Sequence, residues 1–112
     1  MATLMNIIRK HLEDKTMKNK IIEWANERGL LTADNANKQM LKLVEEVGEL
    51  SSAILKNKSL EIADAIGDIQ VVLIILSEQL GYDYDSCLED AYNTIKNRKG
   101  KTINGIFIKD EN

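Results

Sequence analysis

Apolar residues recur at intervals of three and four along most of this sequence, which is the spacing of one face of an α-helix. Near the start they form two stripes: Leu4, Ile7, Ile8 and Leu12, and then Met17, Ile21, Trp24 and Ala25. Gly29 is expected to close the second stripe, because a glycine often ends a helix. The pattern leaves open whether the two stripes belong to one helix or to two.

Three further helices are predicted downstream. The first spans about residues 35 to 56, with Thr32 or Asp34 as its cap and an apolar stripe of Met40, Leu43, Val44, Val47, Leu50 and Ile54. The next spans about 60 to 80, with Ser59 as its expected N-cap and Gly81 as its end. The last begins after Asp83 or Asp85 and stops near Gly100.

The tail and the connections complete the predicted architecture. An Asn-Gly pair, Asn104 and Gly105, stands between apolar residues of the segment 102–108, which predicts a small hairpin. Short connections between helices favour antiparallel neighbours. We therefore expect an all-α, antiparallel four-helix-type bundle with a short C-terminal hairpin.

The composition suits one small helical domain over residues 1–112. The chain contains no proline, and 44% of its residues are hydrophobic. A domain of this length builds only a modest core and often completes its burial by pairing with copies of itself. A homodimer or homotetramer is therefore expected.

Charge and cysteine usage limit the partners and the compartment. The net charge of -3 argues against general binding to nucleic acid. The N-terminus lacks the continuous apolar stretch of a signal peptide, and the longest apolar run, residues 71–76, is too short to span a membrane. Cys87 is the only cysteine, which suits a reducing compartment. We expect a soluble cytoplasmic protein with neither a nucleic-acid nor a membrane partner.

Two acidic clusters carry the candidate chemistry. Glu45, Glu46 and Glu49 lie on the first long helix, with Glu46 on the flank of its apolar stripe; Glu61, Asp64 and Asp68 lie on the next. The second group has spacings of three and four and shares a face with Val71, Val72 and Ile75. Asp64 and Asp68 are therefore expected to point into the bundle.

Buried carboxylates need cations, because an unpaired charge is costly to remove from water. Few lysines lie on these two helices, so a divalent metal is the better counter-ion. Oxygen ligands favour magnesium, with manganese as a substitute; His11 is the only histidine, which argues against zinc and di-iron. Gly48 would suit a close approach of a ligand or another backbone.

Each cluster also has a simpler interpretation. The first could be a solvated helix face, and Glu61 and Asp64 could merely complement the dipole at a helix start. Asp68, in mid-helix before an apolar run, has no comparable structural explanation. If Asp64 and Asp68 were exposed and separated from Glu46 and Glu49, the enzymatic interpretation would fail.

The two motifs together resemble a known family. Leu43-Val44-Glu45-Glu46-Val47-Gly48-Glu49-Leu50, followed by the segment Glu61 to Asp68, is similar to the MazG-like nucleotide pyrophosphohydrolases of the all-α NTP pyrophosphatase superfamily. The family pattern is E-E-x-x-E on one helix and E-x-x-D on the next. The resemblance runs from about Trp24 to Arg98.

This resemblance implies magnesium-dependent hydrolysis of nucleoside and deoxynucleoside triphosphates to the monophosphate and pyrophosphate. It implies metal ligands at Glu46, Glu49, Asp64 and Asp68, with Glu45 and Glu61 next in line. Glu49 or Glu46 would take the proton of the attacking water. Substrate-binding roles are implied for Lys38, Lys42, Trp24, Lys96, Asn97 and Arg98. For Trp24, base stacking and a role as a core anchor are equally weighted; for the lysines, a solvated face is the alternative.

Alternatives remain within and beyond this class. Glu61-x-x-Asp64 resembles phosphoribosyl-ATP pyrophosphohydrolases, whereas aligning Gly67-Asp68 with the MazG pattern places Ala65 where a glutamate is expected. A dUTPase-like specificity is also open. The rival from another class is a non-catalytic helical module whose acidic face binds a basic partner.

Overall fold

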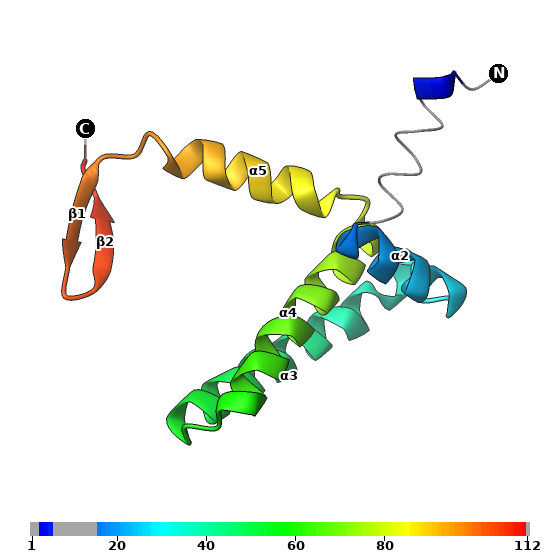
Figure 1. Ribbon diagram of the computed structural model, residues 1–112, viewed down its shortest axis with the longest axis horizontal. Helices are drawn as coiled ribbons and strands as arrows, with labels where there is room; N and C mark the ends of the chain where they lie inside the picture. Colours follow the sequence, from blue (N-terminus) through cyan, green and yellow to red (C-terminus); the bar gives the residue numbers. More distant parts are fainter. Residues whose placement is uncertain (1–2, 6–15, 112) are drawn as a thin grey trace. The chain divides into compact units, whose positions relative to one another are not determined.

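The computed structural model describes residues 3–5 and 16–111, and Figure 1 shows its arrangement. Its elements, in chain order, are α2 (Met17–Glu27), the short 3-10 turn η1 (Ala33–Asn35), α3 (Ala36–Leu55), α4 (Ser59–Leu80), α5 (Tyr84–Ile95), β1 (Gly100–Ile103) and β2 (Ile106–Lys109). The all-α fold class and the C-terminal hairpin are confirmed. Ile7, Ile8, His11 and Leu12 lie outside the described residues.

The chain divides into two compact units, one ending at Tyr82 and the other beginning at Asp83. The first contains α2, η1, α3 and α4; the second contains α5 and the hairpin. The expectation of a single domain over 1–112 stays a prediction.

In the first unit, α3 and α4 lie antiparallel side by side and α2 packs against α4 (Figure 1). Small and branched residues form the core: Ala25, Ala53, Ala65, Val72, Ile74 and Ile75 are each at most 5% exposed. Alanines at this interface allow the two long helices to approach closely. Most of the buried residues of α4 lie in its C-terminal half. The N-terminal half carries the acidic motif, and most of its side chains are exposed to solvent.

Three of the helices are each followed by a residue in the left-handed conformation. Gly29, Asn57 and Gly81 have positive φ angles of 68°, 53° and 82°, and the amide after each donates to a carbonyl five residues back. This is the Schellman arrangement, in which glycine or asparagine adopts the left-handed conformation. The ends at Gly29 and Gly81 are confirmed. Ser59 is not an N-cap; it is the first helical residue, and Lys58 precedes it.

The predicted stripe of the helix 35–56 is only partly buried. Leu43 and Leu50 are half-buried, whereas Met40, Val44, Val47 and Ile54 are exposed. The residues on the face toward α4 are instead Leu43, Glu46, Leu50 and Ala53, which are spaced as one helical stripe. Among the described residues of this unit, none covers that side of the apolar surface of α3.

In the second unit, Asp83 caps α5 by accepting hydrogen bonds from the amide and hydroxyl of Ser86, each at 2.9 Å. The helix ends at Ile95, before the predicted stop near Gly100. Gly100 instead begins β1, where the ring of Phe107 lies 2.6 Å from the position a β-carbon would take. Asn104 and Gly105 both have positive φ, as a two-residue type I′ turn requires.

None of the helices in the described part of the chain is long and apolar enough to cross a membrane.

Gln79 ties the end of α4 to the loop after α2. Its side chain is 5% exposed, and Nε2 donates to the carbonyl of Leu30 at 2.7 Å.

We expect Gln79→Ala to lower the free energy of unfolding by about 1–3 kcal/mol, because the Leu30 carbonyl loses its donor. Urea unfolding followed by the fluorescence of Trp24 measures this in the first unit. Gln70→Ala, at an exposed site on the same helix, should change it by less than about 0.5 kcal/mol; equal losses in both variants would contradict the role of Gln79.

Candidate active site

Carboxylates from both acidic motifs line one hollow on the first unit. Glu49 and Ser52 contribute from α3, and Glu61, Asp64, Ala65 and Asp68 contribute from α4; the hollow measures about 330 Å³. Helical spacing explains the grouping, because 61, 64, 65 and 68 fall on the face of α4 that looks toward α3. The structure thus brings together Glu49, Glu61, Asp64 and Asp68.

The exposure of these carboxylates differs from the expectation. Asp64 and Asp68 are exposed, so the prediction that they point into the bundle interior is wrong. The apolar surroundings begin only one turn later, near Val72, where α2 also packs on α4. The two aspartates are nevertheless not separated from the first motif, because they share the hollow with Glu49.

Glu46 is the buried member of the set. It is 4% exposed and lies on the α3 face that packs against α4, not merely on the flank of the stripe. Its Oε1 atom is 3.2 Å from Nζ of Lys42, one turn earlier. Its Oε2 atom is buried without a hydrogen-bond partner. A half-satisfied buried carboxylate of this kind is uncommon and is typical of a site that receives a ligand or an ion.

Electrostatic repulsion links Glu46 to Glu49. The pKa of Glu49 is raised above its usual 4.5, first by the negative charge of Glu46, then by the hydrogen bond that a protonated Glu49 can donate to Glu46, and by burial. Lys42 opposes the rise and Asp68 adds to it. The two glutamates and Asp68 therefore act on one another, although they come from two helices. A cation placed among them would relieve this repulsion.

These residues fit a magnesium ion in chemistry, without forming a closed cage. The side-chain donors are all oxygens, from four carboxylates and the hydroxyl of Ser52, and oxygens are the ligands that hard cations take. In the described ranges 3–5 and 16–111, no three acidic, histidine or cysteine side chains are gathered tightly enough to hold a metal on their own. Magnesium usually binds through one or two carboxylates together with waters and substrate phosphates, so an open hollow is compatible with it.

The remaining motif positions are placed more simply. The side chain of Glu45 is 67% exposed, 4.0 Å from Lys42, and Glu45 is not among the residues that line the hollow. Ala65, which stands in place of a glutamate only if Gly67-Asp68 is aligned with the MazG pattern, is buried and lines the hollow. A β-carbon added at Gly48 would meet no other atom within 4 Å, so no described backbone makes the close approach that the sequence suggested there.

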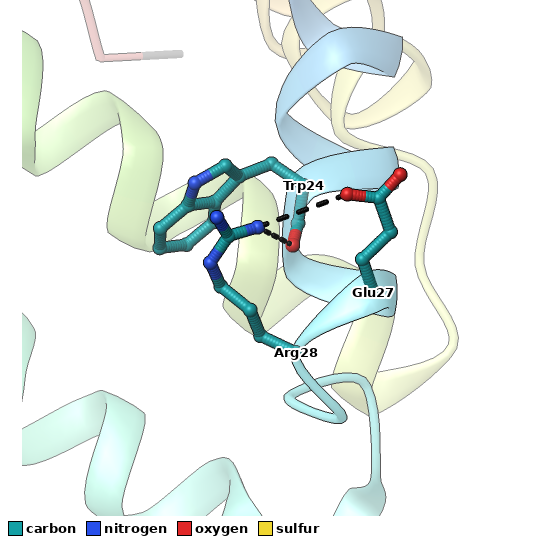
Figure 2. A network of polar contacts seen from close by, with 3 residues as sticks. All are labelled: Trp24, Glu27 and Arg28. Carbon is teal, nitrogen blue, oxygen red and sulfur yellow. Dashed lines mark hydrogen bonds and ion pairs between the residues drawn. The ribbon is translucent and has the colours of Figure 1, made fainter.

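Trp24 is not a core anchor. It is 46% exposed, and the guanidinium of Arg28 lies 4.3 Å from the centre of its ring (Figure 2). Nη1 of Arg28 also donates to the carbonyl of Trp24 at 3.0 Å and lies 3.9 Å from Oε2 of Glu27. Arg28 was not singled out from the sequence, although its position four residues after Trp24 was a signal.

The predicted basic segment belongs to the second unit. Asn97 and Arg98 line a hollow of about 550 Å³ with Lys99, Lys109, Asp110 and Glu111. Lys96 and Arg98 line another, of about 490 Å³, with Tyr92, Ile95 and Phe107. Lys38 is exposed on the first turn of α3. The substrate-binding roles of these residues stay predictions.

Comparison with known proteins agrees with this arrangement of motifs. The model of the MazG nucleotide pyrophosphohydrolase domain matches residues 35–103, which include both acidic helices. An uncharacterised 18.2 kDa protein from the rep-hol intergenic region of Haemophilus phage HP1 is 46% identical over 69 residues. That match covers 62% of this chain and 41% of the phage protein, so the chain spans less than half of its relative. No solved structure matches the chain.

The raised pKa of Glu49 yields a prediction about the metal-free protein. Carboxyl-carbon NMR of Glu49 in the presence of a chelator should show a titration midpoint above 4.5. Because the folded pKa lies above the unfolded value, this group favours the folded state below pH 4.5, and that contribution is lost as the pH rises through the raised pKa. Glu46→Gln should lower the midpoint toward the ordinary glutamate value, since the neutral amide removes the main repulsion.

Asp68→Asn provides the matched comparison. It should lower the midpoint of Glu49 less than Glu46→Gln does, because Asp68 is the weakest of the groups that raise it. A Glu49 midpoint unchanged by Glu46→Gln would show that the two carboxyls do not interact in solution.

Proposed function

The chain belongs to the MazG nucleotide pyrophosphohydrolase family, and we propose that it hydrolyses nucleoside and deoxynucleoside triphosphates to the monophosphate and pyrophosphate in a magnesium-dependent reaction. The observation that carries the proposal is the shared hollow, which gathers Glu49 of the first motif with Glu61, Asp64 and Asp68 of the second. The fold alone would not support this activity, because one fold can host many functions.

The acidity of the hollow requires a cation before a triphosphate can bind, since both surfaces are negative. Magnesium, or manganese in its place, would be held by Glu46, Glu49, Asp64 and Asp68, with Glu61 beside them and Glu45 as the least favoured ligand. When bound, the metal supplies neutralisation of the phosphate charge and a lower pKa for a coordinated water. The exposure of Asp64 and Asp68 leaves the hollow open to a substrate from solvent.

Glu49 is the better candidate for the general base. It is exposed on the wall of the hollow, where a water molecule can reach its carboxylate. Glu46 is buried and already paired with Lys42, which leaves it less access to water. In the reaction, the oxygen of a water molecule forms a bond to the α-phosphorus, and Glu49 accepts one proton of that water. The bond between the α-phosphorus and the oxygen bridging the α- and β-phosphates breaks, so pyrophosphate leaves.

Basic and aromatic side chains would hold the rest of the substrate. Lys38 and Lys42 lie one turn apart on α3 and would contact the phosphates. Substrate-binding roles are proposed separately for Lys96, Asn97 and Arg98 of the second unit. Trp24 would stack on the base. Since Arg28 covers one face of the ring, a base would use the opposite face or displace the guanidinium.

Exposed side chains also bear on the proposed assembly and compartment. The exposed apolar side of α3, formed by Met40, Val44, Val47 and Ile54, supports a homodimer or homotetramer in which another copy covers it. The reduced, exposed thiol of Cys87 suits the cytoplasm.

Two alternatives each have an observation in their favour. Glu61 and Asp64 line the hollow together, as the phosphoribosyl-ATP pyrophosphohydrolase pattern requires. The exposure of Asp64 and Asp68 is what a non-catalytic acidic face would show. The two-helix grouping with Glu49 favours catalysis over a plain binding face.

Pyrophosphate release from a panel of NTPs and dNTPs with magnesium tests the proposal. The wild type should yield monophosphate and pyrophosphate and stop when a chelator removes the metal. Glu49→Gln and Asp68→Asn should each lower kcat by about a hundredfold or more, since each removes a charged group from the hollow. Ranking the panel also tests for a dUTPase-like preference.

Glu78→Gln is the matched control, because Glu78 lies about 15 Å further along the same helix as Asp68. It should retain wild-type turnover, and circular dichroism should show that all variants fold. A folded wild type that is inert on every triphosphate but active on phosphoribosyl-ATP would favour the first alternative. A folded wild type that hydrolyses neither triphosphates nor phosphoribosyl-ATP would favour the second alternative, a non-catalytic binding module.

A further inference from the structure

Lys42 occupies a position that the hydrolytic reaction does not by itself explain. Its Nζ lies 3.2 Å from Oε1 of Glu46 and 4.0 Å from Oε2 of Glu45. The Glu46 side chain is 6% exposed, whereas that of Lys42 is 53% exposed. The pair thus joins a buried carboxylate to an ammonium that remains in contact with solvent.

Glu46 needs this ammonium when no other cation is present. A buried carboxylate without a partner is strongly unfavourable, and no other ion pair with Glu46 is seen in the described part of the chain. Its second oxygen, Oε2, is buried and has no hydrogen-bond partner. Lys42 therefore satisfies one oxygen and leaves the other available.

We propose that Lys42 is the resident counter-ion of Glu46, that it competes with the divalent cation for this carboxylate, and that cation binding releases its ammonium for the substrate phosphates. The inference rests on the proposed function, because it takes Glu46 as part of the cation site. It assigns Lys42 a positioning role in the metal-free protein that precedes any contact with substrate.

The chemistry of the pair suits such an exchange. Lysine is a point charge on a flexible stem, and an i, i+4 pair whose cation is half exposed is weak. Lys42 also remains charged at neutral pH, since a hydrogen bond to Glu46 and its negative charge raise the pKa of the ammonium above 10.5. A divalent ion near Glu46 would repel this charge, and the lysine can leave without disturbing α3.

Binding of Mn²⁺, measured from the electron paramagnetic resonance signal of the free ion, tests the competition without substrate or turnover. Lys42→Met keeps the stem and removes the charge, so it should bind Mn²⁺ about three- to tenfold tighter than the wild type. Lys38→Met is the matched control, because it removes the same charge one turn earlier on α3, where the structure gives the lysine no ion pair. It should change the affinity by less than about twofold. Equal or weaker binding by Lys42→Met would overturn the proposal.

A second measurement uses the wild type and does not depend on how Lys42→Met folds. In a titration with diamagnetic Mg²⁺, the side-chain εCH₂ NMR signal of Lys42 should move toward that of a free lysine, while that of Lys38 stays in place. A Lys42 signal that is unchanged at saturating Mg²⁺ would show that the pair persists and that no exchange occurs.

The outcomes separate this inference from the function beneath it. A wild type that binds Mn²⁺ and turns over triphosphates, with no gain in affinity in Lys42→Met, would overturn the counter-ion role alone. Absence of Mn²⁺ binding in both proteins, with triphosphates still turned over, would also overturn the counter-ion role alone, because the ion would then enter only with substrate phosphates. Absence of both Mn²⁺ binding and turnover would overturn the cation site, and with it both proposals.

Discussion

The carboxyl group of Glu46 is buried where α3 packs against α4, and most of the candidate site can be derived from the need to satisfy its charge. One oxygen is paired with Lys42 and the other has no partner. The same charge raises the pKa of Glu49, which lies on the wall of the hollow. An apolar residue at position 46 would pack the two helices without this cost. A buried acid at this position therefore suits the cation site proposed for it.

The hollow lined by Glu49 and the second acidic motif combines high negative charge with access to solvent. It is lined by four carboxylates, those of Glu49, Glu61, Asp64 and Asp68. In the described residues, one of the four has an ion pair: Oε1 of Glu61 lies 3.7 Å from Nζ of Lys58, and both side chains are exposed. Such a pair offsets little repulsion in water. A triphosphate could enter only with cations that reverse the local charge, so substrate and metal binding should be linked.

Within the described residues, each unit leaves apolar side chains exposed. The core between α3 and α4 rests on small residues such as Ala53 and Ala65, whereas Met40, Val44 and Val47 stay exposed on one side of α3. In the second unit, Ile103, Ile106 and Ile108 share one exposed face of the hairpin. These exposed apolar faces of the described residues are compatible with the self-assembly proposed for a domain with so modest a core.

The sequence by itself determined the helices, the Asn-Gly hairpin and the two acidic motifs, because helical periodicity, turn residues and motif spacing are local properties of the chain. It also placed the helix ends at Gly29 and Gly81, but it missed Asn57, since asparagine adopts the left-handed conformation less regularly than glycine. Only the tertiary structure decided which side of the α3 stripe faces α4, that Glu46 is buried while Asp64 and Asp68 are exposed, and that Glu49 shares their hollow. Those outcomes depend on how two helices approach each other, and the apolar surface of α3 is wide enough to allow more than one approach.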